Sequence, residues 1–139
     1  MIEHDSSTAI VAPRLRRCGL GFESGGLSLA HALTCGLSAH PATSRAAHGD
    51  MVAFGTLVQL VHQEHAEAEI ADIARFAREC GLPTTLAGLG LDSVSADGLE
   101  AIAIPTLTAP FIGNVRRPLD RAGLVAALLR ADELGRKAA

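Results

Sequence analysis

The stretch GFESGGLSLAHAL, residues 21–33, is followed after a short loop by HGDMVAFG, residues 48–55. In the first stretch and its continuation, apolar residues recur three and four positions apart, as on one face of an α-helix: Leu27, Ala30, Leu33 and Leu37. Ser24 can cap the start of this helix, and Gly36 can end it. The second stretch predicts another apolar helix from about Gly49. Two consecutive apolar helices predict a fold made of packed helices.

The rest of the chain shows the same helical periodicity. The segment 66–80 is the clearest amphipathic helix, because its apolar residues share one side and its charged residues the other. We also expect a short helix after Ser95, an irregular proline-containing stretch, and a final helix from about Pro118 to Lys137. The sequence shows neither a convincing alternating strand nor a repeat of about 20–50 residues. It therefore predicts an all-α helical bundle.

The composition indicates one domain that packs against a partner. The chain has 139 residues, of which 48% are hydrophobic and 19% are charged. An average globular protein has about 25% charged residues. A small domain has a large share of surface to keep in contact with water, so the apolar excess predicts a face that meets a second copy or another domain.

From the charge and the N-terminus we expect neither a nucleic-acid-binding protein nor a secreted or membrane-spanning one. The net charge of −3 provides no basic surface for nucleic acid. The N-terminus lacks the positive start and apolar run of a secretory signal, and the longest uncharged run, 24–44, carries too many polar residues and glycines to span a membrane. The three cysteines, Cys18, Cys35 and Cys80, form no CxxC pair, which favours reduced thiols in a cytoplasmic protein.

Two of the six histidines stand where a metal site could form. His31 lies within the first apolar helix and His48 at the start of the second. Imidazole is a good ligand for zinc and iron, and the short loop between the helices allows both rings to face one cleft. The spacing alone leaves a second interpretation open, because a single histidine on an apolar helix is more often a hydrogen-bonded core residue.

Other motifs carry weaker signals. His62 and His65, in HQEH, are three residues apart rather than the four that place both rings of an HExxH helix on one metal, so we interpret them as a solvated helix end. GFESGG follows no strand, which excludes a dinucleotide-binding turn, and its glycines fit tight turns. No base is placed beside Cys35, which favours an inert thiol.

Four motifs, in this order and spacing, resemble the C-terminal half of glycerol dehydrogenases in the iron-containing alcohol dehydrogenase family: GLGFESGGLSLAHAL, HGDMVAFGTLVQLV, ECGLPTTLAGLGL and LVAALLRADELGRK. The resemblance covers residues 19–139, whereas residues 1–18 match poorly. It implies a helical domain in which His31 and His48 bind a divalent metal, zinc or iron, together with an aspartate from an earlier part of the enzyme. It also implies that Phe22 lies near the substrate pocket.

The resemblance further implies an oxidation of glycerol or a related alcohol to a ketone, with hydride transfer to NAD. In the family, NAD is held by an N-terminal domain, which we expect to be missing from this chain. The expected partners are therefore an NAD-binding half, the alcohol, and further copies in a homo-oligomer. A second hypothesis is a non-catalytic helical assembly module derived from the same family, which the presence of Thr34 where many members carry another histidine favours.

Overall fold

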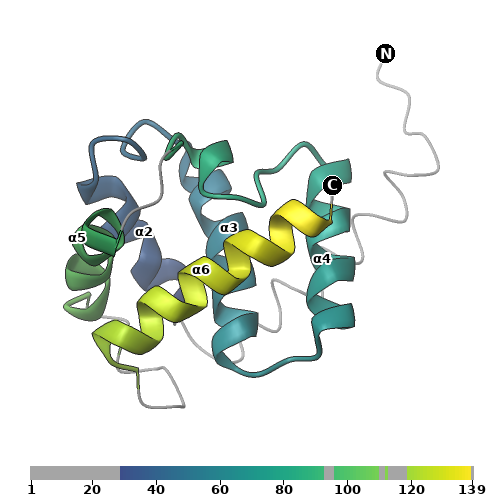
Figure 1. The fold of residues 1–139 in the computed structure, drawn as a ribbon. Helices are drawn as coiled ribbons and strands as arrows, with labels where there is room; N and C mark the ends of the chain where they lie inside the picture. Colours follow the sequence, from purple (N-terminus) through teal and green to yellow (C-terminus); the bar gives the residue numbers. More distant parts are fainter. Residues whose placement is uncertain (1–28, 93–95, 110–111, 113–118, 139) are drawn as a thin grey trace.

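The computed structural model describes residues 29–92, 96–109, 112 and 119–138, and this part of the chain is helical throughout its regular structure (Figure 1). Its elements are α2 (Leu29–Ala39), α3 (His48–His62), α4 (Glu67–Glu79), the short 3₁₀ helix η1 (Ala87–Leu89), α5 (Ala96–Leu107) and α6 (Arg121–Lys137). No strand occurs within those residues. The prediction of an all-α fold is confirmed. Ser24, Phe22 and the preamble 1–18 lie outside the described residues.

The helices pack as a bundle crossed by the last helix. In Figure 1, α6 runs diagonally across α3, with α4 at one end and α2 and α5 at the other. α2 packs against both α3 and α5, and α6 packs against α3, α4 and α5. α3 and α6 therefore form the centre of the molecule. The loop between α2 and α3 reverses the direction of the chain, so that α3 packs against α2.

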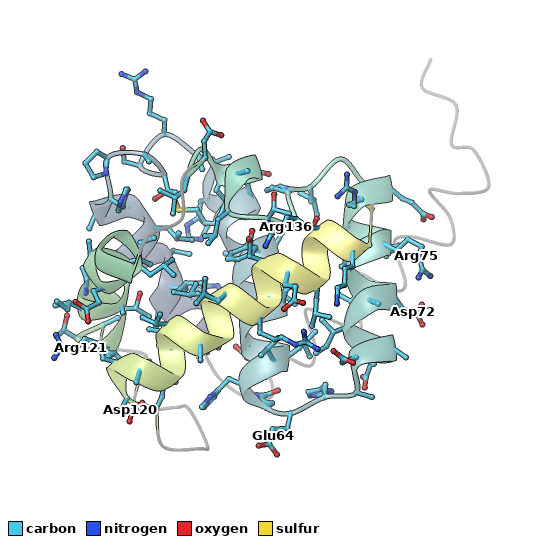
Figure 2. The ribbon with its side chains drawn as sticks, viewed as in Figure 1. Glu64, Asp72, Arg75, Asp120, Arg121 and Arg136 are labelled. Carbon is cyan, nitrogen blue, oxygen red and sulfur yellow. The ribbon has the colours of Figure 1, made fainter. Side chains whose placement is uncertain are left out.

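One continuous apolar core joins all five α-helices of the described chain. Its largest fully buried side chains include Phe54 from α3, Ile102 from α5 and Leu128 from α6. α4 contributes a narrower buried side, while its Asp72 and Arg75 point outward and form a surface ion pair at 3.0 Å (Figure 2). The amphipathic helix predicted over 66–80 is thus confirmed, within one residue at each end.

The predicted end of the first helix at Gly36 is wrong, because α2 continues to Ala39. Gly36 is buried inside the helix, where an added Cβ would lie only 2.1 Å from the carbonyl oxygen of Ile102 in α5. The glycine therefore allows two helix backbones to touch. A side chain at this position would separate α2 from α5.

Two other boundaries also differ from the sequence expectation. α5 runs through Pro105 to Leu107, although a proline inside a helix has no amide hydrogen to donate. α6 begins at Arg121, and the carboxylate of Asp120 accepts a hydrogen bond from the Gly123 amide at 2.7 Å. Asp120 is therefore the N-cap of the last helix. Pro118, the predicted start, lies outside the described residues.

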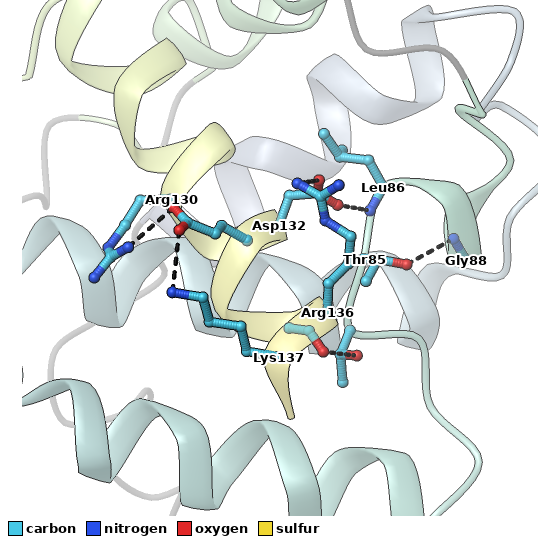
Figure 3. Close-up of polar contacts among 10 residues, drawn as sticks. Thr85, Leu86, Gly88, Arg130, Asp132, Arg136 and Lys137 are labelled. Carbon is cyan, nitrogen blue, oxygen red and sulfur yellow. Dashed lines mark hydrogen bonds and ion pairs between the residues drawn. The ribbon is translucent and has the colours of Figure 1, made fainter. Parts of the chain in front are cut away.

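A polar connection joins the segment after α4 to α6 (Figure 3). The buried carboxylate of Asp132 accepts a hydrogen bond from the Leu86 amide at 2.8 Å and faces the guanidinium of Arg136 at 3.3 Å. Nearby, the Thr84 hydroxyl donates to the Gly135 carbonyl at 3.4 Å. The first bond satisfies a backbone amide that lies outside the helices, and the last one satisfies a carbonyl in the final turn of α6. No helix of the described chain is long and apolar enough to cross a membrane.

Candidate metal centre

The structure brings His31 and His48 together. Their ring centroids are 6.2 Å apart, and the ring planes are tilted by 51°. With a zinc–nitrogen bond of about 2.1 Å and a centroid-to-nitrogen distance of about 1.1 Å, each ligating ring has its centroid about 3.2 Å from the ion, so two rings at a tetrahedral angle lie about 5.2 Å apart. The observed separation exceeds this distance by about 1 Å. The two rings are neighbours, and an approach of about 1 Å would allow them to share one ion.

The surroundings of the rings differ. His31 is half-buried, and its Nδ1 is enclosed by the protein. Among the described residues, it is the one buried side-chain nitrogen or oxygen without a hydrogen-bond partner. Buried polar atoms are nearly always paired, so an enclosed imidazole nitrogen beside a second imidazole is unusual. His48 is exposed. The pair thus combines a ring held inside the bundle with one accessible from outside, and it fits a metal ion better than a satisfied core histidine.

The loop between α2 and α3 determines how the two helices meet. The Ala42 amide donates to Nδ1 of His40 at 3.0 Å, and the Thr43 hydroxyl donates to the Leu37 carbonyl, so local bonds turn the chain at the end of α2. The contacts then run in opposite order along the two helices: Ala30 meets Gln59, and Ser38 meets Met51. α2 and α3 are therefore antiparallel, as the loop length predicts.

The sequence reasoning missed Gln59. This side chain is 8% exposed, and its Oε1 accepts a hydrogen bond from the Ala30 amide at 3.0 Å. Ala30 immediately precedes His31, so the bond joins α3 to α2 at the residue next to His31. A signal was present, because Gln59 stands alone as an amide in the apolar run GTLVQLV. A polar residue within an apolar helix face indicates a buried group with a specific partner.

The structure brings none of the weaker candidates into a ligand group with His31 and His48 within the described residues. Nδ1 of His65 faces Glu69 at 3.3 Å and its Nε2 faces Gln63 at 3.3 Å, which fits the solvated helix end expected for HQEH. Cys35 and Cys80 are free, half-buried thiols, and the Thr34 hydroxyl donates to the His31 carbonyl of its own helix. Within the described ranges, we find no group of three or more His, Cys, Asp or Glu side chains that could hold a metal ion.

Comparison with known proteins identifies the relatives of this fold as oxidoreductases. The chain is 37% identical to the glycolaldehyde reductase of Halobacterium salinarum, with 98% of the chain and 39% of that protein aligned. It is 40% identical to the glycerol dehydrogenase of Thermotoga maritima, over 85% of the chain and 33% of that protein. No protein-family profile matches the sequence.

Two solved structures with a similar fold are both described as glycerol dehydrogenases, one of them as a probable one. The crystal structure of the glycerol dehydrogenase from Schizosaccharomyces pombe superposes with a TM-score of 0.77 at 35% identity, over 86% of this chain and 31% of that one. A probable glycerol dehydrogenase from Sinorhizobium meliloti gives 0.76 at 34% identity. The chain is therefore a homologue of the glycerol dehydrogenases, and its fold is that of their C-terminal helical domain. It spans only about a third of the length of these relatives.

Proposed function

We propose that this chain is the metal-binding helical part of an NAD-dependent polyol dehydrogenase that oxidises glycerol or a related alcohol to a ketone. The observation that supports the proposal most directly is the pair of imidazoles 6.2 Å apart, one with an enclosed nitrogen that has no hydrogen-bond partner among the described residues, in a chain homologous to glycerol dehydrogenases. His31 and His48 are the two proposed ligands. The ion is zinc or iron, because both accept imidazole nitrogen.

The proposed roles follow from the positions of the residues. When bound, a zinc or iron ion supplies a Lewis acid that makes the alcohol hydroxyl easier to deprotonate, and NAD supplies the hydride acceptor. His31 orients the ion from the bundle side, where α2 and α3 exclude water. His48 faces outward, where the substrate and further ligands can approach. Phe22 is proposed to shape the substrate pocket.

Two imidazoles alone hold a divalent ion weakly, because zinc in a catalytic site usually has three protein ligands. We propose that a carboxylate from an NAD-binding domain or polypeptide completes the site, and that the active protein is a cytoplasmic homo-oligomer. The free thiols of Cys35 and Cys80 are compatible with a reducing compartment. Catalysis on this proposal requires both parts.

The metal site can be tested without activity. Zinc that binds the folded state raises the melting temperature, by an amount equivalent to about 1.4 kcal/mol for each tenfold excess over the dissociation constant. We expect zinc to stabilise the wild-type chain and the double variant His62→Ala/His65→Ala, but not His31→Ala/His48→Ala. The two double variants lose the same number of imidazoles, so nonspecific zinc binding affects both equally.

The same experiment decides between the two hypotheses. Equal zinc stabilisation, or none, in the wild type and the His31→Ala/His48→Ala variant contradicts the metal site and favours the non-catalytic assembly module. A zinc response that depends on this pair supports the enzyme part. Mixing the chain with an NAD-binding polypeptide, NAD and glycerol should then yield NADH, measured by its absorbance. No complex and no NADH contradict the proposed activity but not the metal site.

A further inference from the structure

Gln59 is a buried amide that contacts α2 at the residue before His31. Its side chain is 8% exposed, and its Oε1 accepts the hydrogen bond of the Ala30 amide at 3.0 Å within the protein interior. A hydrogen bond of this length in a buried setting is directional, so it restricts both the rotation and the sliding of one helix against the other. Gln59 therefore fixes the start of the described part of α2 against α3.

Gly55 brings the two backbones into contact at the same point. An added Cβ on Gly55 would lie 2.8 Å from the carbonyl oxygen and 3.1 Å from the Cα of Ala30. His48, Gly55 and Gln59 are seven and four residues apart, which places all three along one side of α3. One stripe of α3 thus carries an exposed imidazole at its start and two contacts to Ala30 further along.

The distance between the two histidine rings depends on the contact that Gln59 and Gly55 make with Ala30. The centroid separation of 6.2 Å is already longer than the about 5.2 Å expected for two rings at a tetrahedral angle on one ion, so an outward shift of α2 takes the rings further out of range. His31 directly follows the residue that Gln59 and Gly55 hold. A movement of α2 at Ala30 therefore moves His31 relative to His48.

We propose that Gln59 is a positioning residue for the His31–His48 pair, and that Gly55 allows the close approach that its hydrogen bond needs. The inference rests on the proposed function, because it concerns the same metal site. A buried amide costs free energy unless it is hydrogen-bonded, and an apolar side chain of similar size would fill the core without that cost. The amide is therefore better explained by alignment of α2 and α3 than by packing.

The test compares zinc affinity with stability in the absence of zinc. Gln59→Met keeps the length of the side chain and removes the acceptor, whereas Gln59→Glu keeps an acceptor for the Ala30 amide. Asp132→Ala is the matched control, because it removes another buried acceptor of a backbone amide, that of Leu86, between α6 and the segment after α4. Zinc dissociation constants are measured by calorimetric titration, and melting temperatures by circular dichroism.

We expect Gln59→Met to weaken zinc binding about tenfold, the lower end of the effect of residues that orient metal ligands. Gln59→Glu should restore most of the affinity. Asp132→Ala should lower the melting temperature without zinc and leave the dissociation constant within about twofold of the wild type. This split separates positioning from general destabilisation, since a merely structural residue changes only the melting temperature.

Zinc affinity equal to that of the wild type in folded Gln59→Met overturns the inference and leaves the proposed metal site intact. If Gln59→Met does not fold, Gly55→Ala decides in its place, because its added methyl group pushes against Ala30: weaker binding supports the inference, and unchanged binding overturns it. Wild-type zinc binding that does not depend on His48 overturns both the proposed function and this inference. The two failures are therefore distinguishable.

Discussion

Glu64 adopts a backbone conformation that normally belongs to glycine. Its φ is 61°, at the turn between α3 and α4 where Figure 2 labels it. The Glu64 amide donates to the Val61 carbonyl at 3.0 Å and the His65 amide to the Leu60 carbonyl at 3.1 Å, the pattern of a helix end closed by a left-handed residue. A side chain in this conformation costs about 1–2 kcal/mol.

We expect Glu64→Gly to raise the free energy of unfolding by about 0.5–1 kcal/mol, because relief of the left-handed strain exceeds the entropy that glycine adds to the unfolded chain. Urea denaturation measures the change. Gly81→Ala is the reverse control: Gly81 ends α4 in the same way at a φ of 78°, and an added Cβ meets no atom within 4 Å. It should destabilise by about 1 kcal/mol. A neutral Glu64→Gly beside a costly Gly81→Ala contradicts the argument.

At the scale of a single residue, the sequence predicted that His31 and His48 lie close together. It did not predict Gln59, which holds α2 against α3 next to His31. Both histidines lie in motifs with recognisable flanks, and a short loop between antiparallel helices restricts where they can meet. Gln59 has no such motif, because its role depends on Ala30, which is 29 positions away in the sequence. A polar residue in an apolar run indicates that it has a buried partner, but the sequence does not indicate which residue that partner is.

Among the elements, α6 depends on a single capping side chain. Asp120 accepts the Gly123 amide at 2.7 Å and precedes the helix that crosses the bundle (Figures 1 and 2). We expect Asp120→Ala to destabilise the protein by about 1 kcal/mol, because the first turn loses an acceptor for its amides. Asp72→Ala, on the exposed side of α4, should cost less than about 0.5 kcal/mol. Thermal unfolding compares them, and equal losses would show that the cap contributes no more than a surface charge.

The elements that the sequence predicted well are those whose signals are local. α4 has an apolar side and a charged side within its own residues, and α6 ends in the basic Arg136 and Lys137 that suit a helix C-terminus. Gly36 was misread as a helix end because its reason lies in α5, whose Ile102 carbonyl it touches. Glycine at a helix end and glycine at a helix crossing look alike until the partner helix is known.

For the whole molecule, the sequence predicted the all-helical class and the similarity to glycerol dehydrogenases, whereas the third ligand of the proposed metal site stays a prediction. The apolar excess was interpreted as a face for a partner. Within the described residues, Ile104 on α5 and Leu129 on α6 are the large apolar side chains that are most exposed, at 50% and 45%. The partner itself stays a prediction, because composition indicates that a face is covered but not what covers it.

A chain of ion pairs connects α4 to α6, and we expect it to make the stability of the protein depend on pH. Arg130 pairs with Glu67 of α4 and with Glu133, which Lys137 also contacts; Figure 3 shows Arg130 and Lys137 on this carboxylate. The hydrogen bond from Lys137, followed by that from Arg130, lowers the pKa of Glu133 below its ordinary value of 4.5. The ionised form is therefore favoured in the folded state.

A carboxyl group whose pKa is lowered by folding stabilises the protein above its ordinary pKa, and this contribution is lost as the pH falls from 4.5 toward the folded value. We therefore expect Glu133→Gln to lower the melting temperature at about pH 7 and to have a smaller effect at about pH 3. The difference should also shrink in about 1 M salt, since these side chains are partly exposed and salt screens them. Glu79→Gln removes the same charge from an exposed position of α4 and controls for net charge. A difference between Glu133→Gln and wild type that is independent of pH and salt would mean that packing, rather than ionisation, accounts for it.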